Sequence, residues 1–166
     1  MKILRTKLKG VYLIKNYVFK DFRGKYFEIY NEKNFFKKKI KIKFIQDDIS
    51  MSKKNVLRGI HGDKKTWKLI TCIEGKFKLL VVNNDKKSKQ FKKWQMFTLS
   101  ENNNHQVLVP PKFGNAHFVL SKRAIFHYKQ NTIYDRKSQF TIKWNDPLYK
   151  FNWPKTGKKI ISKRDK

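Results

Sequence analysis

Alternation of apolar and polar residues with a period of two is the feature that most constrains how this chain can fold. The pattern is typical of strands that bury one face, and it recurs in the segments 26–30, 40–45, 67–73, 77–82, 94–99, 106–109, 116–120, 124–129 and 140–144. Turn-forming sequences such as Asn83-Asn84-Asp85 separate these segments, and only 31–38 has the spacing of a short internal helix. Many short strands joined by turns predict an antiparallel sandwich or barrel, for which a jelly roll is one common solution.

The charge of the chain is extreme but says little about its function. The 166 residues include 41 Lys and Arg against 12 Asp and Glu, which gives a formal net charge of +29. Of the 41 basic residues, 35 are Lys and 6 are Arg, and the abundant residue types have A/T-rich codons, which indicates a skewed genome composition. A nucleic-acid-binding barrel is an alternative because aromatic residues are interleaved with the charge. No Arg-rich tract supports it, so we expect no nucleic-acid partner.

Hydrophobic content, length, apolar runs and cysteine count further limit the class of protein. With 39% hydrophobic and 15% aromatic residues the chain has enough core material to fold. Its length predicts one domain over 1–166, in which 155–166 is a basic C-terminal tail that is free to be flexible. No apolar run approaches the ~20 residues of a membrane span or the ~7–15 of a signal-peptide core. The single cysteine, Cys72, excludes an intrachain disulfide and a cysteine-based zinc site. These features predict a cytoplasmic protein without membrane partners.

Segment 58–63 is the densest in candidate functional residues. It reads Arg-Gly-Ile-His-Gly-Asp, and two glycines around His61 in a chain with only 7 Gly indicate a close approach of backbone or ligand. Strand parity places Arg58 on one face and His61 with Asp63 on the other. Taken alone, a hydrogen-bonded structural histidine near a turn explains this pattern better than a catalytic one.

Two later strands carry further candidates. Asn115 and His117 share a strand face, so both can enter the same pocket. Tyr128 shares a face with Phe126, and His127 lies on the opposite face. Taken singly, aromatic residues in such strands are more often core or surface residues than catalysts.

A metal site is one alternative use of these residues. His61, Asp63 and the distant His117 have the layout of a two-histidine, one-carboxylate iron site, which barrel-shaped oxygenases use. Three residues spaced this loosely occur often by chance. An iron-dependent oxygenase is therefore a minor hypothesis.

An ordered series of short motifs covers nearly the whole chain. Residues 19–28 read F-K-D-F-R-G-K-Y-F-E, and residues 52–61 read S-K-K-N-V-L-R-G-I-H. Further motifs follow in order at 44–48, 67–70, 106–111, 128–134, 142–147 and 161–165. Together they resemble the family of nucleotide-sugar epimerases typified by dTDP-4-dehydrorhamnose 3,5-epimerase. The resemblance implies an all-β, cupin-like antiparallel jelly-roll barrel with short peripheral helices.

The resemblance implies a cofactor-independent isomerase that inverts C3, C5 or both in a nucleoside-diphosphate 4-keto-6-deoxy sugar. The ketone acidifies the protons on its two neighbouring carbons. A base can therefore remove one of them to leave an enolate, and an acid can return a proton to the opposite face. His61 would be the base, held in one tautomer by Asp165. Lys68 would stabilise the enolate oxygen, and Tyr128 would be the acid. No metal or redox cofactor is required.

The resemblance also implies binding residues and partners. Arg23 and Arg58 would hold the diphosphate through forked, charge-assisted hydrogen bonds. The residues that match family positions near the nucleotide base are Phe27, Glu28, Gln46 and Tyr134, and those expected in the sugar pocket are Asn115 and His117. The implied partners are a nucleoside-diphosphate sugar of polysaccharide biosynthesis and a second copy of the chain, in a homodimer with strand exchange between subunits.

Several positions depart from the family pattern. Gly62-Asp63 replaces an aromatic residue and a glutamine, and Asn115 aligns with the family's second pocket histidine. Leu79 and Gln139 stand where the family has Asp and Glu. These departures leave open which carbon is inverted and whether the nucleotide is dTDP or GDP. A GDP-linked 4-keto-heptose C3 or C3/C5 epimerase of capsular polysaccharide synthesis is the main alternative, and a catalytically inactive sugar-nucleotide-binding module is another.

Overall fold

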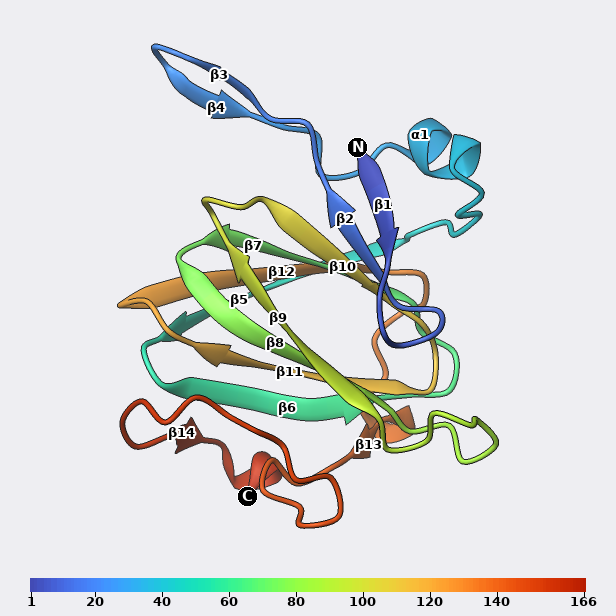
Figure 1. The fold of residues 1–166 in the computed structure, drawn as a ribbon, viewed down its shortest axis with the longest axis vertical. Helices are drawn as coiled ribbons and strands as arrows, with labels where there is room; N and C mark the ends of the chain where they lie inside the picture. The colour runs from blue at the N-terminus through green and yellow to red at the C-terminus, as the bar shows by residue number, and fades with distance from the viewer.

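Two face-to-face β-sheets form most of the computed structural model, which describes all 166 residues (Figure 1). The first sheet contains, in spatial order, β1 (Lys2–Arg5), β2 (Tyr12–Lys15), β10 (His105–Val109), β7 (Lys68–Glu74), β12 (Arg123–Gln130) and β5 (Gln46–Lys53). The second contains β13 (Phe140–Thr141), β6 (Val56–Gly62), β11 (Phe113–Val119), β8 (Lys76–Asn83) and β9 (Trp94–Ser100), with β14 (Ile160–Ile161) beside β6. Neighbouring strands are antiparallel except β14, which is parallel to β6. The predicted antiparallel jelly-roll barrel is confirmed.

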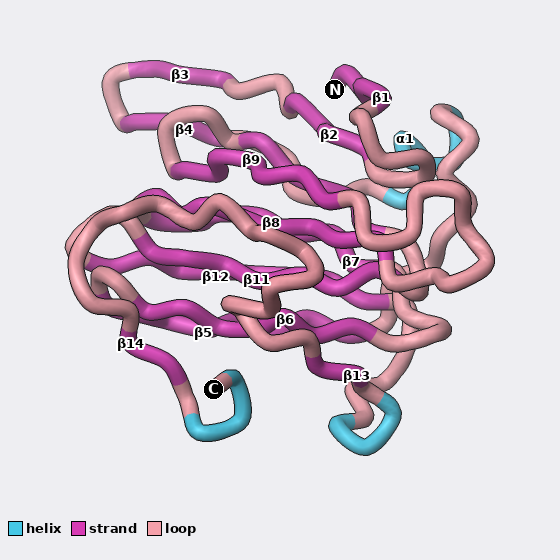
Figure 2. The backbone as a smooth tube through the Cα atoms, turned by 60° about the horizontal axis from the view of Figure 1, so that its bottom comes forward, coloured by secondary structure: helices cyan, strands magenta, loops and turns pink.

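The remaining elements lie around the barrel. A hairpin of β3 (Phe19–Asp21) and β4 (Gly24–Tyr26) extends away from both sheets (Figure 1). The only α-helix is α1 (Glu32–Lys37), which begins where the Asn31 side chain accepts the Asn34 backbone N–H. Two short 3₁₀ helices, η1 (Arg136–Ser138) and η2 (Lys163–Asp165), complete the set, and Figure 2 shows all helical turns outside the strands. None of the helices has the length and apolar character needed to cross a membrane.

The core explains the longest apolar run of the sequence, residues 79–82. All four side chains are fully buried. Leu79 and Val81 belong to the cluster between the two sheets, whereas Leu80 and Val82 belong to a cluster on the outer face of the second sheet. The segment after β13 covers that outer face, so β8 is buried on both sides, as its continuous apolar run indicates.

Two predicted strands are wrong. The predicted strand 26–30 is a strand only at Tyr26, the last residue of β4, and 40–45 forms no strand, although the apolar residues of both segments alternate. Tyr30 stacks edge-on against Phe35 and Phe44, and its hydroxyl donates to the Ile42 carbonyl at 3.2 Å. The alternating apolar side chains of these segments pack against α1 and the outer face of the first sheet. Their backbone does not pair with a neighbouring strand.

The end of the chain packs beside β6. Within residues 155–166, for which the sequence predicts a basic tail free to be flexible, β14 pairs with β6. Asp165 is only 3% exposed. The backbone N–H of Ile160 also donates to the Asn55 carbonyl at 2.9 Å. The C-terminal segment is therefore part of the wall beside β6.

Candidate active site

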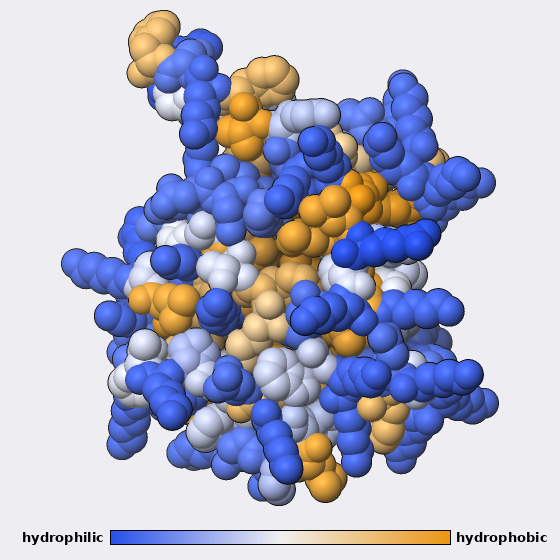
Figure 3. Space-filling view, viewed as in Figure 1, coloured by the Kyte–Doolittle hydropathy of each residue, from blue (hydrophilic) through white to orange (hydrophobic).

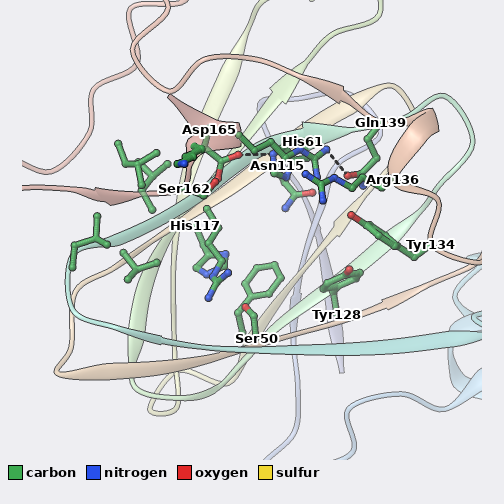
Figure 4. Close-up of a pocket in the computed structure, with 18 of the residues that line it drawn as sticks. Ser50, His61, Asn115, His117, Tyr128, Tyr134, Arg136, Gln139, Ser162 and Asp165 are labelled. Atoms are coloured by element: carbon green, nitrogen blue, oxygen red, sulfur yellow. Dashed lines mark hydrogen bonds and ion pairs between the residues drawn. The ribbon is translucent and has the colours of Figure 1, made fainter.

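A cavity of about 760 Å³ lies between the two sheets near the C-terminal segment. Strands from both sheets, the loop after β12 and η2 contribute its lining. The predicted site residues that line it are Arg58, His61, Lys68, Asn115, His117, Tyr128, Tyr134 and Asp165. Residues separated by more than 100 positions in the sequence are thus brought to one cavity (Figure 4).

His61 and Asp165 form a hydrogen-bonded pair on one wall. The His61 Nε2 atom lies 2.7 Å from Asp165 Oδ1. Because a carboxylate only accepts hydrogen bonds, Nε2 donates to it and Nδ1 carries the lone pair. The other oxygen of Asp165 accepts the Gly59 backbone N–H at 3.3 Å, so the carboxylate is held from two sides.

The surroundings of His61 favour its neutral form. Burial is the largest influence and lowers the pKa of the imidazole, and the charges of Arg164 and Lys68 act in the same direction. The Asp165 carboxylate opposes them and raises it, but the net pKa is below the ordinary value of 6.5. A neutral imidazole with a free Nδ1 can accept a proton at neutral pH.

Tyr128 and Lys68 lie on the opposite wall, on β12 and β7 of the first sheet (Figure 4 labels Tyr128). The Lys68 Nζ atom is 5.1 Å from the centre of the Tyr128 ring. Burial lowers the pKa of Lys68, while the charges of Asp63 and Asp48 raise it. Burial and the neighbouring Asp48 charge raise the pKa of Tyr128, so its hydroxyl keeps its proton.

A register shift places Arg58 and His61 on the same side, which corrects the prediction from strand parity. Between Asn115, which is opposite His61, and His117, which is opposite Arg58, β6 carries one residue more than β11. An extra residue reverses the alternation beyond it. Gly59 has a φ of +113°, and a Cβ there would lie 2.6 Å from the Asn115 carbonyl oxygen. The predicted close backbone approach around His61 is thus present.

His117 lies among apolar side chains. Its ring stacks on Phe126 with 4.2 Å between centroids, and it is opposite Leu79 across the β11–β8 pair. Its Nε2 atom is buried without a hydrogen-bond partner. Burial, aided by the charge of Arg58, lowers the pKa of His117 to about 3. Buried in these surroundings, His117 is a neutral group at neutral pH.

The iron hypothesis fails on geometry. No three His, Cys, Asp or Glu side chains lie close enough together to hold a metal ion. Asp63 instead accepts the backbone N–H groups of Lys65 and Thr66 at 2.8 and 2.7 Å. The carboxylate of the proposed triad therefore shapes a turn.

Four of the predicted binding residues lie outside the cavity. Arg23 is on the β3–β4 hairpin, where its guanidinium contacts Asp21 at 2.6 Å. Glu28 accepts hydrogen bonds from the side chains of Asn31 and Asn34. Phe27 lies between the hairpin and α1, and Gln46 supports the site indirectly, because its Oε1 accepts the Tyr134 backbone N–H at 2.8 Å.

The cavity also contains residues that the motifs did not single out as site residues. These are Ser50, Val56, Leu57, Phe126, Arg136, Gln139, Ile160, Ile161, Ser162, Lys163 and Arg164. Arg164 donates to the Gln139 side chain at 3.0 Å. The chain has only 6 Arg, and Arg58, Arg136 and Arg164 all line this cavity. Scarcity of arginine among so many lysines is the sequence signal that could have identified Arg136 and Arg164.

Known proteins resemble this chain over nearly its whole length. The sequence model of the dTDP-4-dehydrorhamnose 3,5-epimerase family matches residues 5–166. The enzyme of that name from Salmonella typhimurium is 35% identical over 170 residues, which cover 99% of this chain and 92% of the relative. The corresponding Pseudomonas aeruginosa enzyme is 32% identical over 169 residues, or 100% of this chain and 93% of the relative.

Solved structures agree with the sequence matches. The dTDP-6-deoxy-D-glucose-3,5-epimerase of Legionella pneumophila, in complex with dTDP-4-keto-L-rhamnose, superposes with a TM-score of 0.95 at 30% identity and covers 99% of this chain and 89% of its own. The Elizabethkingia anophelis epimerase gives 0.89 at 37% identity, with 99% and 93% covered. Fold, motifs and relatives agree. The chain is an isomerase and belongs to the dTDP-4-dehydrorhamnose 3,5-epimerase family.

Proposed function

We propose that this chain inverts C3, C5 or both in the 4-keto-6-deoxyhexose of a dTDP-sugar. The observation that carries the proposal is the His61–Asp165 pair facing Tyr128 and Lys68 across one cavity. Inversion at a carbon needs a base on one side of the sugar and an acid on the other. The nucleotide is argued from the relatives, since the Legionella pneumophila enzyme was solved with a dTDP-sugar and the Bacillus anthracis enzyme with TDP.

The proposed reaction is a proton abstraction followed by a proton return. Nδ1 of His61 takes the proton from the carbon beside the ketone, and the C–H electron pair forms the enolate double bond while the carbonyl pair moves to oxygen. The Lys68 ammonium stabilises the negative oxygen. The Tyr128 hydroxyl then donates its proton to the opposite face as the carbonyl re-forms. Solvent afterwards takes the proton from His61 and returns one to Tyr128.

Basic side chains support the binding of a diphosphate. Arg58, Arg136 and Arg164 line the cavity, and guanidinium groups suit bidentate contacts with phosphate oxygens. The wider charge of +29 adds a positive field that draws anions inward. Figure 3 shows hydrophilic side chains over most of one face with apolar residues in small groups. The specific contacts with a diphosphate would come from the arginines that line the cavity.

A GDP-linked 4-keto-heptose is the second candidate substrate. Ser50 on β5 and His117 on β11 both line the cavity, and Ser50 Oγ and His117 Nε2 are buried without hydrogen-bond partners. Buried polar groups normally find partners, and a heptose has a longer side chain with a further hydroxyl to offer. The absence of a carboxylate at Gln139, which lines the cavity, and at Leu79, which is opposite His117 on β8, also departs from the pattern that the sequence motifs imply.

Deuterium exchange distinguishes these candidates. We expect the protein in deuterated water to introduce deuterium at C3, C5 or both of dTDP-4-keto-6-deoxyglucose, because abstraction and return use solvent protons. Mass spectrometry and NMR of the recovered sugar measure the incorporation and its position. Exchange with the GDP-linked 4-keto-heptose alone would favour the second candidate. No exchange with either sugar would contradict an epimerase and favour the inactive binding module.

We also propose that the chain works as a homodimer. Ile49, Met51 and Ile73 are exposed by 60%, 73% and 37% on the outer face of the first sheet, and an exposed apolar area of this kind favours association. Arg23 and Phe27 lie outside the cavity of their own chain, which fits exchange of the hairpin with a partner.

We expect sedimentation to give twice the 20.1 kDa chain mass, and an Ile49→Glu, Met51→Glu variant to sediment as a monomer. A wild type of single-chain mass would contradict the dimer.

A further inference from the structure

The C-terminal segment, residues 155–166, supplies part of the cavity wall without belonging to a long ladder. Its consecutive residues 160–165 all line the cavity, and they include Asp165, which bonds His61. Figure 1 shows the segment beside β6, with which β14 pairs through only two residues. So short a ladder is a weak attachment for a segment that carries a site residue, so other contacts are needed to hold it.

Lys159 makes two of these contacts, immediately before β14. Its Nζ atom lies 5.2 Å from the centre of the Trp144 ring and 5.5 Å from the centre of the Phe118 ring. Phe118 is fully buried in the cluster on the outer face of the second sheet, and Trp144 is in the segment after β13 that covers this face. Lys159 thus attaches the C-terminal segment both to the sheet and to the segment that covers it.

Both distances suit a cation–π attraction. An ammonium within about 6 Å of an aromatic ring centre is attracted by the ring, most strongly by Trp and where water is partly excluded. Lys159 is partly buried, whereas Lys155, Lys158 and Lys163 of the same segment are exposed. Lys159 is also the only basic residue that lies over two rings. Its surroundings therefore differ from those of the lysines around it.

The stretch from Lys159 to Asp165 is held at its two ends. Next to Lys159, the Ile160 backbone N–H donates to the Asn55 carbonyl at 2.9 Å. At the other end, Asp165 Oδ1 lies 2.7 Å from His61 Nε2. Release of the first end would free the stretch to move, and the carboxylate with it.

We propose that Lys159 is a positioning residue, which holds the C-terminal segment against Phe118 and Trp144 and so keeps Asp165 beside His61. The inference rests on the proposed function, because it concerns the orientation of the proposed base. Lys159 does not line the cavity and touches neither the sugar nor the reacting carbon. It acts on the equilibrium between an attached and a detached C-terminal segment, and only the attached form contains the hydrogen-bonded pair.

Amide hydrogen exchange tests the attachment directly. Lys159→Gln removes the charge, so the detached form should become about 2–30-fold more populated, the range of a cation–π attraction. The Ile160 amide should exchange with solvent faster by the same factor, while the amides of β8 and β12 keep their protection. Lys158→Gln, at the exposed neighbouring position, is the matched control and should change nothing. Lys159→Arg should keep the protection, because a guanidinium also binds aromatic faces.

Enzyme kinetics test whether the attachment acts through Asp165. Lys159→Gln should lower kcat for deuterium exchange into the sugar by about twofold or more, because the detached form lacks the oriented base. In an Asp165→Asn background the same substitution should have no further effect on kcat, since a residue that works only through Asp165 has nothing left to position. Trp144→Leu, which removes one of the two rings, is a second variant and should give the same changes as Lys159→Gln.

Two results would overturn the inference. One is an unchanged Ile160 exchange rate or an unchanged kcat in folded Lys159→Gln. The other is a loss of kcat that persists in full in the Asp165→Asn background. If the wild type introduced no deuterium into either sugar, the proposed function would fail instead, while the Ile160 amide would still report the attachment, so the two failures are distinguishable.

Discussion

Replacing His61 with alanine is expected to slow both deuterium exchange and inversion by about 10²–10⁴-fold, the contribution typical of a general base. Nδ1 of His61 is the unprotonated nitrogen of the only His–carboxylate pair that lines the cavity. His117 cannot replace it, because its pKa is about 3 and so weak a base would not abstract the proton efficiently. Exchange measured by mass spectrometry under single-turnover conditions gives the loss directly.

The control for His61→Ala is His105→Ala. His105 is on β10, outside the cavity lining, so its removal should leave exchange unchanged. Binding of dTDP, measured by calorimetry, should be preserved in both variants, because the basic residues of the cavity remain. Substantial exchange in His61→Ala would assign the base to another residue and contradict the proposed roles.

Replacing Asp165 with asparagine is expected to lower kcat by about 10²-fold or more, as loss of the orienting carboxylate does in other histidine pairs. The substitution keeps the size of the side chain but lets the amide donate to His61 Nε2, which favours the wrong tautomer. The charge of Asp165 raises the pKa of His61, so its loss lowers that pKa further. The acid limb of kcat/KM should therefore move to lower pH, because the neutral base then persists to more acidic conditions.

Asp146→Asn is the matched control for Asp165→Asn. Asp146 caps a turn by accepting the Leu148 backbone N–H at 2.9 Å and does not line the cavity. Its substitution should change neither kcat nor the acid limb. If Asp165→Asn kept the wild-type rate and pH profile, the hydrogen bond to His61 would have no part in the reaction.

Local sequence pattern predicted the barrel well where alternation reflects sheet pairing. It failed at 27–30 and 40–45, where the same alternation packs side chains against α1 and the first sheet. Alternation of apolar and polar residues indicates that one face of a segment is buried. It does not indicate which element covers that face. Pairing partners, and hence the strands of each sheet, depend on contacts between distant residues.

The site was predictable as a set of residues but not as a geometry. Motifs singled out His61, Lys68, Tyr128 and Asp165 together, and the cavity contains all four. The register shift between β6 and β11 was not predictable, because it depends on how Gly59 fits against its neighbour strand. Parity counting along one strand cannot detect an extra residue that only the pairing reveals.

The parallel attachment of β14 to β6 gives the molecule two levels of stability. β14 has two residues, whereas the two sheets contain long ladders such as β8–β9 and β12–β5. Proteins open in cooperative units of unequal free energy, and a segment held by so short a ladder opens before the barrel does. This segment positions Asp165 beside His61. On warming, the enzyme should therefore lose activity reversibly at a temperature at which its two sheets are still folded.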